Sequence, residues 1–342
     1  MALFDTIRAG ASGAADAYEV ERSLRFNRND SARLQLGTLN GNKKTFTISC
    51  WTKLAKFDNE KSVFSVTQNS GGQFSIDFMS DQTFQVREFS IHTNGETINL
   101  RTNRRFRDPS AWLHVLVAID TTQSTSSNRA KIYFNGTQET SFSTASYPSQ
   151  NREFYVNNNT DNSRTHIGSQ SYAGTSNNFD GYLSEFYLID GTALQPSDFG
   201  ETNALTGQFN PIVYTGSFGT NGVYLNFSDN SNTTSTTLGK DSSGVGNNFT
   251  PSNFNVTANS VDNDSVLDTP TNNWCVMNIF TGYWSEGGSI PFSDGSLHAD
   301  NPNSGDRAGF ATFRLEGGKK YYIEGKYFEQ GSGSQCKWAI TT

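Results

Sequence analysis

The chain has 342 residues, with 26 basic and 33 acidic side chains and a net charge of −7. This length is enough for two ordinary domains, each with its own core. The basic residues are spread thinly, without the basic stripe that displaces counterions from nucleic-acid phosphates. No apolar stretch reaches the length of a signal peptide or a membrane span. We therefore expect no nucleic-acid partner and no membrane insertion.

The residue types favour an all-β protein. The chain contains 26 Phe and 13 Tyr, and aromatic residues suit the pleated, half-buried surface of a sheet. It also has 31 Gly and many Asn, Ser and Thr, which supply turns between strands. Its three cysteines, Cys50, Cys275 and Cys336, are too few and too far apart for a disulfide framework or a zinc site. Cys50 is expected in the core, and synthesis is expected in a reducing cytosol.

The first segment, residues 1–17, is set apart by its small residues from Ala9 to Ala17, which cannot build a core. One interpretation is a disordered tail. The other is a peptide that becomes ordered on a partner. Its apolar anchors would be Leu3, Phe4 and Ile7, and its charged anchor would be Arg8.

Strand signals begin at Tyr18 and recur at short intervals through residues 18–200. Ser23–Asn27 alternates apolar and polar residues, which is typical of a half-buried strand. His114–Ile119 is apolar on both faces and is predicted at the centre of a sheet. Asn135-Gly136 favours a two-residue hairpin turn. Such regularly spaced short strands predict a sandwich or barrel.

The second half of the chain shows fewer strands. Residues 201–273 are rich in Asn, Ser, Thr and Gly, and we interpret them as an extended connector packed against the sandwich. From Trp274 the strand pattern returns, and Ala311–Leu315 with Tyr321–Phe328 form a plausible hairpin. Residues 274–342 are therefore predicted to be a second, small β module, complete or the beginning of a larger one.

Several segments, in the same order along the chain, resemble the strands of concanavalin A-like, laminin G-like domains. The family pattern is an early Phe-Thr-Ile-x-x-Trp strand, a Trp-x-His-Val strand paired with one ending in Asn-Gly, and a closing aromatic-x-Gly run. The matching segments are Phe46–Trp51, Trp112–Asp120 with Arg129–Gly136, and Ile167–Gly168 with Phe179–Phe186. The resemblance implies a jelly-roll sandwich over residues 18–200.

Other segments resemble the large virion proteins of tailed phages, particularly marine ones. These are Met1–Gly10, Phe106–Trp112, Gln195–Gly200 and Leu238–Asn248, while Gly318–Phe328 resembles the opening strands of a SPRY-type sandwich. The resemblance implies a structural role, with residues 1–17 docking on a tail adaptor, a nozzle or the capsid. It also implies a location in the virion tail, synthesis in the host cytoplasm and assembly as a homotrimer.

Jelly-roll domains include glucanases, which act through a pair of carboxylates. Retaining glucanases of this shape carry acids at i, i+2 and i+4 on one strand, which places them on one face. Glu185 and Asp190 are five apart and are predicted to face opposite sides of the sheet. The histidines are scattered singly, at His92, His114, His166 and His298. The sequence therefore predicts no enzyme.

Two kinds of rim site remain as expectations. Aromatic rings and amides on sandwich-rim loops suit glycans, because rings stack on sugars and amides hydrogen-bond to hydroxyls. The candidates are Tyr147, Tyr172, Asn177 and Asn178. No cofactor is expected, although calcium could bind at Asp180 with Asn177 and Asn178, or at Asp241 with Asn247 and Asn248. The alternative for these residues is simple turn formation.

The most specific functional hypothesis is therefore a tail fibre or related appendage, anchored by its N-terminal segment and binding host surface glycan. A capsid decoration protein is the first alternative. A polysaccharide-degrading tail enzyme, with carboxylates contributed by different strands, is the second.

Overall fold

A computed structural model describes residues 18–273, except 56, 58, 91–94, 159–161, 171–175, 259 and 261, and also describes two short strands at 283–285 and 308–310. Its described part contains strands and three one-turn 3-10 helices but no α-helix, which confirms the all-β prediction. None of its helices is long and apolar enough to cross a membrane. The expected docking peptide and most of the expected C-terminal module lie outside the described residues.

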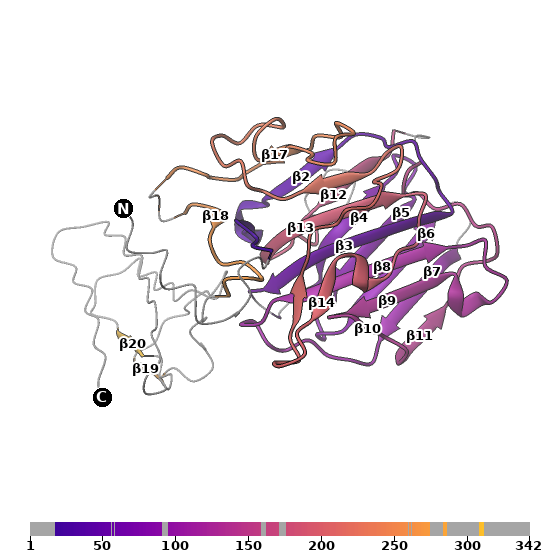
Figure 1. Cartoon of the computed structure of the whole chain (residues 1–342), viewed down its shortest axis with the longest axis horizontal. Helices are drawn as coiled ribbons and strands as arrows, with labels where there is room; N and C mark the ends of the chain where they lie inside the picture. The colour runs from indigo at the N-terminus through magenta and orange to yellow at the C-terminus, as the bar shows by residue number, and fades with distance from the viewer. Residues whose placement is uncertain are drawn as a thin grey trace.

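The first sheet, sheet A, has eight antiparallel strands in the order β10-β9-β8-β3-β13-β1-β18, with β16 also paired to β13 (Figure 1). Strands β1 and β16 pair with successive parts of β13, on the side away from β3. The strands are β1 (Ser23–Phe26), β3 (Thr45–Leu54), β8 (Leu113–Asp120), β9 (Ala130–Phe134), β10 (Thr137–Gln138), β13 (Gly181–Asp190), β16 (Val223–Leu225) and β18 (Ser265–Val266).

The second sheet, sheet B, has eight antiparallel strands in the order β11-β7-β6-β5-β4-β12-β2-β17. They are β2 (Arg33–Leu36), β4 (Lys61–Thr67), β5 (Gln73–Phe78), β6 (Phe84–Ser90), β7 (Gly95–Thr102), β11 (Phe142–Ser146), β12 (Arg164–Ile167) and β17 (Thr250–Ser252). Two small antiparallel pairs complete the strands: β14 (Gly200–Thr202) with β15 (Phe209–Pro211), and β19 (Tyr283–Ser285) with β20 (Ala308–Phe310). The 3-10 helices are η2 (Arg28–Asp30), η3 (Ser126–Asn128) and η4 (Pro196–Asp198).

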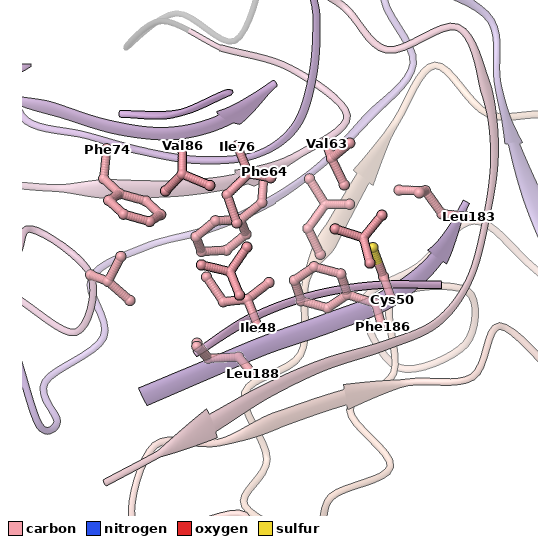
Figure 2. Packing of buried hydrophobic residues seen from close by; sticks show 14 of the residues in the cluster. Ile48, Cys50, Val63, Phe64, Phe74, Ile76, Val86, Leu183, Phe186 and Leu188 are labelled. Atoms are coloured by element: carbon pink, nitrogen blue, oxygen red, sulfur yellow. The ribbon is translucent and has the colours of Figure 1, made fainter. Parts of the chain in front are cut away.

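The main core lies between the two sheets, where alternate residues of each strand point inward (Figure 2). Ile48 and Cys50 from β3 lie opposite Phe64 and Ile76 from sheet B. Period-2 alternation explains this arrangement, because only every second side chain of a strand faces the same side. Cys50 is buried there as expected.

Strand β8 confirms the prediction that His114–Ile119 lies inside a sheet, since it pairs with β3 on one side and β9 on the other. Its odd-numbered residues, such as Val117, join the main core. Its even-numbered Leu116 and Ala118 join a second apolar cluster on the outer face of sheet A. The predicted turn follows β9, where Asn135 and Gly136 have φ values of 47° and 81°, as a two-residue hairpin turn with both central residues left-handed requires.

Residues 201–273 are part of the sandwich. They supply strand β16 to sheet A, β17 to sheet B and β18 to the edge of sheet A. Five of their side chains are buried in the main core: Val223, Leu225, Phe227, Leu238 and Phe249. The segment thus packs on the sandwich, and the described sandwich continues past residue 200 instead of closing there.

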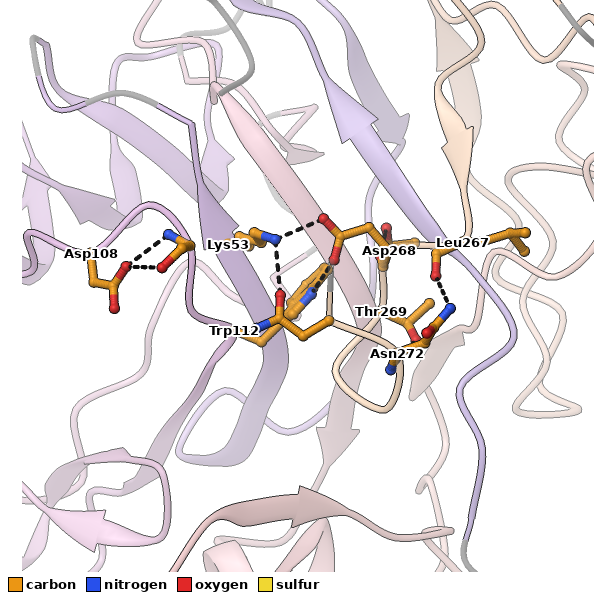
Figure 3. A network of polar contacts seen from close by, with 10 residues as sticks. Lys53, Asp108, Trp112, Leu267, Asp268, Thr269 and Asn272 are labelled. Atoms are coloured by element: carbon orange, nitrogen blue, oxygen red, sulfur yellow. Dashed lines mark hydrogen bonds and ion pairs between the residues drawn. The ribbon is translucent and has the colours of Figure 1, made fainter. Parts of the chain in front are cut away.

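A buried polar network holds the last part of this segment against β3 and Trp112 (Figure 3). The Lys53 ammonium lies 2.7 Å from one carboxylate oxygen of Asp268 and 2.9 Å from the Asn273 side-chain oxygen. The Trp112 indole N–H donates to the other Asp268 oxygen at 2.9 Å. At the same end of the sandwich, the Val20 amide donates to the Thr271 hydroxyl at 3.0 Å. The chain therefore enters and leaves the sandwich at one end.

Candidate functional site

The outer face of sheet B carries a row of polar side chains. On strands β2, β12, β4 and β5, most inward residues are apolar, and the residues between them point outward. We call a group of these outward residues the polar strip. The strip consists of Arg33 and Gln35 on β2, Arg164 and His166 on β12, Ser65 and Thr67 on β4, and Ser75 and Asp77 on β5, together with Arg87 on the neighbouring β6.

Strand register brings these residues together. His166 pairs with Gln35 of β2 on one side and with Ser65 of β4 on the other. Ser65 pairs in turn with Ser75, which pairs with Arg87. Directly paired residues on one face are close enough for side-chain contact. The row therefore runs unbroken across five strands.

The middle of the strip is buried, and its two ends are half-buried. Ser65, Ser75, Asp77 and His166 are at most 2% exposed, whereas Arg33, Gln35, Arg87 and Arg164 are half-buried. Small hydroxyls thus lie in the middle, with arginines toward both ends. The Ser65 hydroxyl donates to the Ser169 carbonyl at 2.8 Å, and the Ser75 hydroxyl donates to Asp77 at 2.6 Å.

Several buried polar atoms of the strip have no hydrogen-bond partner within the described protein. They are both ring nitrogens of His166, the Thr67 hydroxyl, one Asp77 carboxyl oxygen and Arg33 Nε. Each such group costs roughly 1–3 kcal/mol when left unsatisfied. Native proteins keep few such groups, so their clustering on one face requires a physical explanation.

Charge and burial set the protonation of the strip. Burial, followed by the nearby Arg33 and Arg164 charges, lowers the pKa of His166 to about 4, so the ring is neutral at pH 7. Burial raises the pKa of Asp77 to about 7, against the opposing effect of its 2.6 Å hydrogen bond from the Ser75 hydroxyl. Near neutral pH, therefore, the Asp77 carboxyl can donate as well as accept.

The residues expected to bind glycan are only partly brought together. Asn177 and Asn178 lie side by side near the start of β4, where the Ser62 amide donates to the Asn177 carbonyl at 2.8 Å. The Asn177 amide donates to Glu60 at 2.8 Å and the Asn178 amide to Ser31 at 3.0 Å. Tyr147 follows β11 at the far edge of sheet B and packs half-buried against the main core. Tyr172 lies outside the described residues.

The two expected calcium loops differ in what surrounds their carboxylates. Asp241 accepts hydrogen bonds from the amides of Tyr224, Ser243, Gly246 and Asn247 and from the Ser243 hydroxyl. This pattern builds its own loop, as the turn-forming alternative requires. Asp180 is buried. Among the described residues, no three His, Cys, Asp or Glu side chains gather in metal-binding range, and calcium at Asp180 stays a prediction.

The two acids of β13 lie on opposite faces, as their spacing predicts. Glu185, at a bulge with φ 50°, accepts hydrogen bonds from the hydroxyls of Tyr18, Tyr187 and Tyr224, each at 2.8 Å. Those tyrosines lie on the outer side of sheet A. Asp190 instead accepts from the Asn42 amide at 2.6 Å and the Asn157 side chain at 3.0 Å. Both carboxylates are thus held by structural hydrogen bonds.

His114 occupies an aromatic pocket on the outer face of sheet A. Its Nε2 lies 2.8 Å from the Ser49 hydroxyl, and its ring packs 5.1 Å from Trp51 and 5.2 Å from Phe209, between centroids. Burial lowers the pKa of His114 to about 3. These contacts hold the His114 ring within the packing of the outer face of sheet A.

Two antiparallel sheets packed face to face around one core define a jelly-roll sandwich. The chain belongs to the concanavalin A-like lectin/glucanases superfamily, whose laminin G-type model matches residues 26–198. The fold predicted from sequence is therefore correct. No curated protein matches the chain.

Solved structures similar to this chain include a heptameric SAP-like pentraxin from Limulus polyphemus, at 16% identity and a TM-score of 0.38, covering 58% of this chain and 91% of the pentraxin chain. A putative carbohydrate binding protein from Bacteroides ovatus has 13% identity and a TM-score of 0.41, with coverages of 69% and 59%. Domains LG4-5 of the mouse laminin alpha1 chain have 11% identity and a TM-score of 0.34, with coverages of 59% and 50%.

Proposed function

We propose that this chain is a saccharide-binding structural protein of a tailed-phage virion, and that its sandwich binds host surface glycan on the polar strip. The observation that carries the saccharide part is the set of buried, unpartnered polar atoms on one face, beside half-buried arginines. Sugars present many hydroxyls that both donate and accept, which suits such a face. Membership of the lectin/glucanase superfamily agrees with this reading.

The virion part of the proposal is supported by the sequence resemblance to tailed-phage virion proteins at Met1–Gly10, Gln195–Gly200 and Leu238–Asn248. In this proposal the N-terminal segment docks on the tail and three copies assemble. A capsid decoration protein is the alternative location.

We also propose binding without hydrolysis. The support is the arrangement of acids: Glu185 and Asp190 face opposite sides of sheet A, while the strip carries the single buried carboxyl Asp77. Glycoside hydrolysis ordinarily needs two carboxyl groups flanking one bond. Release of reducing ends from host polysaccharide by the purified chain would contradict this part.

Adsorption of the labelled full chain to host cells tests the saccharide part. Periodate oxidation of the cells, which cleaves sugar diols, is expected to abolish adsorption. Gln35→Trp, which adds a bulky ring on the strip, is expected to reduce it at least tenfold, whereas Ser124→Trp, on the exposed loop between β8 and β9, leaves it unchanged. The proposal is contradicted if the chain still adsorbs to periodate-treated cells. It is also contradicted if the Gln35→Trp variant adsorbs as well as the original chain.

Electron microscopy of intact particles with antibody fragments against residues 18–200 tests the location. Antibody label at the tail supports a tail fibre, and label spread over the head supports a capsid decoration protein. If the particles carry no label, the proposed place in the virion is wrong.

A further inference from the structure

A lysine amine, a carboxylate and a carboxamide meet at the end of the sandwich where the chain enters and leaves it. Lys53 Nζ lies 2.7 Å from Asp268 Oδ2 and 2.9 Å from Asn273 Oδ1. Figure 3 shows Lys53 and Asp268 pointing toward each other, from β3 and from the chain that follows β18. The amine therefore contacts both a group that can take its proton and the carbonyl of an amide.

The amine is enclosed by protein. The Lys53 side chain is 0% exposed and that of Asp268 is 9% exposed. The Trp112 indole donates to Asp268 Oδ1 at 2.9 Å, and its ring lies 6.5 Å from that of Tyr182, which pairs with Lys53 on β13. Such surroundings disfavour charged groups. Transfer of a proton from Lys53 to Asp268 leaves two neutral groups, and the uncharged amine is the nucleophilic form of lysine.

The side chain of Asn273 is placed to be attacked by this amine. Its oxygen accepts a hydrogen bond from Lys53 Nζ, which polarises the carbonyl and brings the carboxamide carbon beside the amine. Asn273 itself is exposed. Ammonia released from its amide can therefore leave into water, which prevents the reverse reaction.

We propose that Lys53 and Asn273 become joined by an isopeptide bond in the folded chain. Asp268 takes one proton from the Lys53 ammonium, and the uncharged Nζ attacks Cγ of Asn273. The Nζ–Cγ bond forms and the Cγ–Nδ2 bond breaks. Asp268 gives its proton to Nδ2, which leaves as ammonia, and accepts a second proton from Nζ, which then passes to water. The step consumes no oxidant, reductant or other reactant.

The bond ties the exit of the chain to the middle of sheet A. Strand β3 has ten residues and lies between β8 and β13, whereas β18, which holds the end of the 201–273 segment by strand pairing, has two residues. Asn273 is followed by residues 274–342. Tension applied through those residues therefore reaches β3 through a covalent bond and does not pull on β18 alone.

Mass spectrometry of the full chain tests the bond directly. The chain is expected to be lighter than its sequence requires by about 17 Da, the mass of ammonia. Trypsin is expected to release residues 45–56 and 241–307 joined as one peptide, because an acylated Lys53 is no longer a cleavage site. A chain with its full sequence mass overturns the inference, as does separate recovery of the two peptides.

Two variants test the roles of the reacting groups. Asn273→Ala, at an exposed position, is expected to abolish the joined peptide, whereas Asn272→Ala, the neighbouring exposed amide, is the matched control and is expected to keep it. Asp268→Asn is expected to lower the joined fraction at least about tenfold, since a positioned base contributes that much or more. An unchanged joined fraction in Asn273→Ala or Asp268→Asn contradicts the step.

Closure of Asn273 on its own backbone would also release ammonia, but it does not need a lysine. Lys53→Arg separates the two reactions. Loss of the mass difference in Lys53→Arg supports the isopeptide bond. A mass difference that persists in this variant, without any joined peptide in the original chain, overturns the inference.

Discussion

Asp77 is a carboxyl group held where its charge is unfavourable. Its pKa is about 7 in the folded chain, against an ordinary value of 3.8, chiefly because it is buried. The folded state therefore holds the proton more tightly than the unfolded state does. The stability contributed by the protonated form is fully present below about pH 4 and is lost as the pH rises through 7.

Replacing Asp77 by Asn is expected to remove this loss, because the amide is neutral at every pH. Compared with the original chain, Asp77→Asn should have a free energy of unfolding higher by on the order of 2–4 kcal/mol at pH 8, with a much smaller difference at pH 5. Urea titrations at the two pH values measure this, and the exposed Glu201→Gln serves as control. An equal gain in the free energy of unfolding at both pH values would contradict a raised pKa of Asp77 in the folded chain.

Glu185, also at the residue scale, shows what sequence spacing alone can miss. Its five-residue separation from Asp190 correctly predicts opposite faces. Its bulge and its three tyrosine partners depend on Tyr18 and Tyr224, which are remote in the chain. A local pattern cannot reveal such contacts, since they arise only when distant strands pair.

Elements with a strong local signal were predictable, and weak ones were not. Strand β8 is apolar on both faces and is long enough for its burial to be recognised. The Asn135-Gly136 turn has a conformational cause that is visible in the sequence. Strands β16, β17 and β18 have three residues or fewer, so they lack any readable period. Their strand conformation comes from pairing with β13, β2 and β1.

The hydrogen bonds and ion pair among Lys53, Asp268 and Trp112 are expected to be the main interactions that hold the end of the 201–273 segment against β3. Asp268→Ala would leave a fully buried ammonium without its carboxylate, which typically costs about 3–5 kcal/mol. The matched control, Glu153→Ala, removes an exposed ion pair with Lys44 at 3.9 Å and should cost about 1 kcal/mol or less. Chemical denaturation of the three chains measures both. Similar costs for the two substitutions would contradict the role given to the network.

For the whole molecule, the sandwich follows from sequence because strand periodicity and family motifs act over many residues. The polar strip could not be predicted from the sequence, because its residues come together only when β2, β12, β4 and β5 lie side by side in one sheet. The available signal is weak: Ser, Thr and Asp alternate with Phe, Val and Ile in β4 and β5. The sequence directed attention instead to rim amides and to Tyr147, which packs against the core.

The central claim is that saccharide binds on the outer face of sheet B, and side-chain NMR of the isotope-labelled full chain tests it most directly. During titration with glycan extracted from the host surface, the Arg33 Nε–H and His166 ring signals are expected to shift together. The His114 ring, enclosed on sheet A, should not move. Binding of the glycan without any change at Arg33 and His166 would contradict the claim.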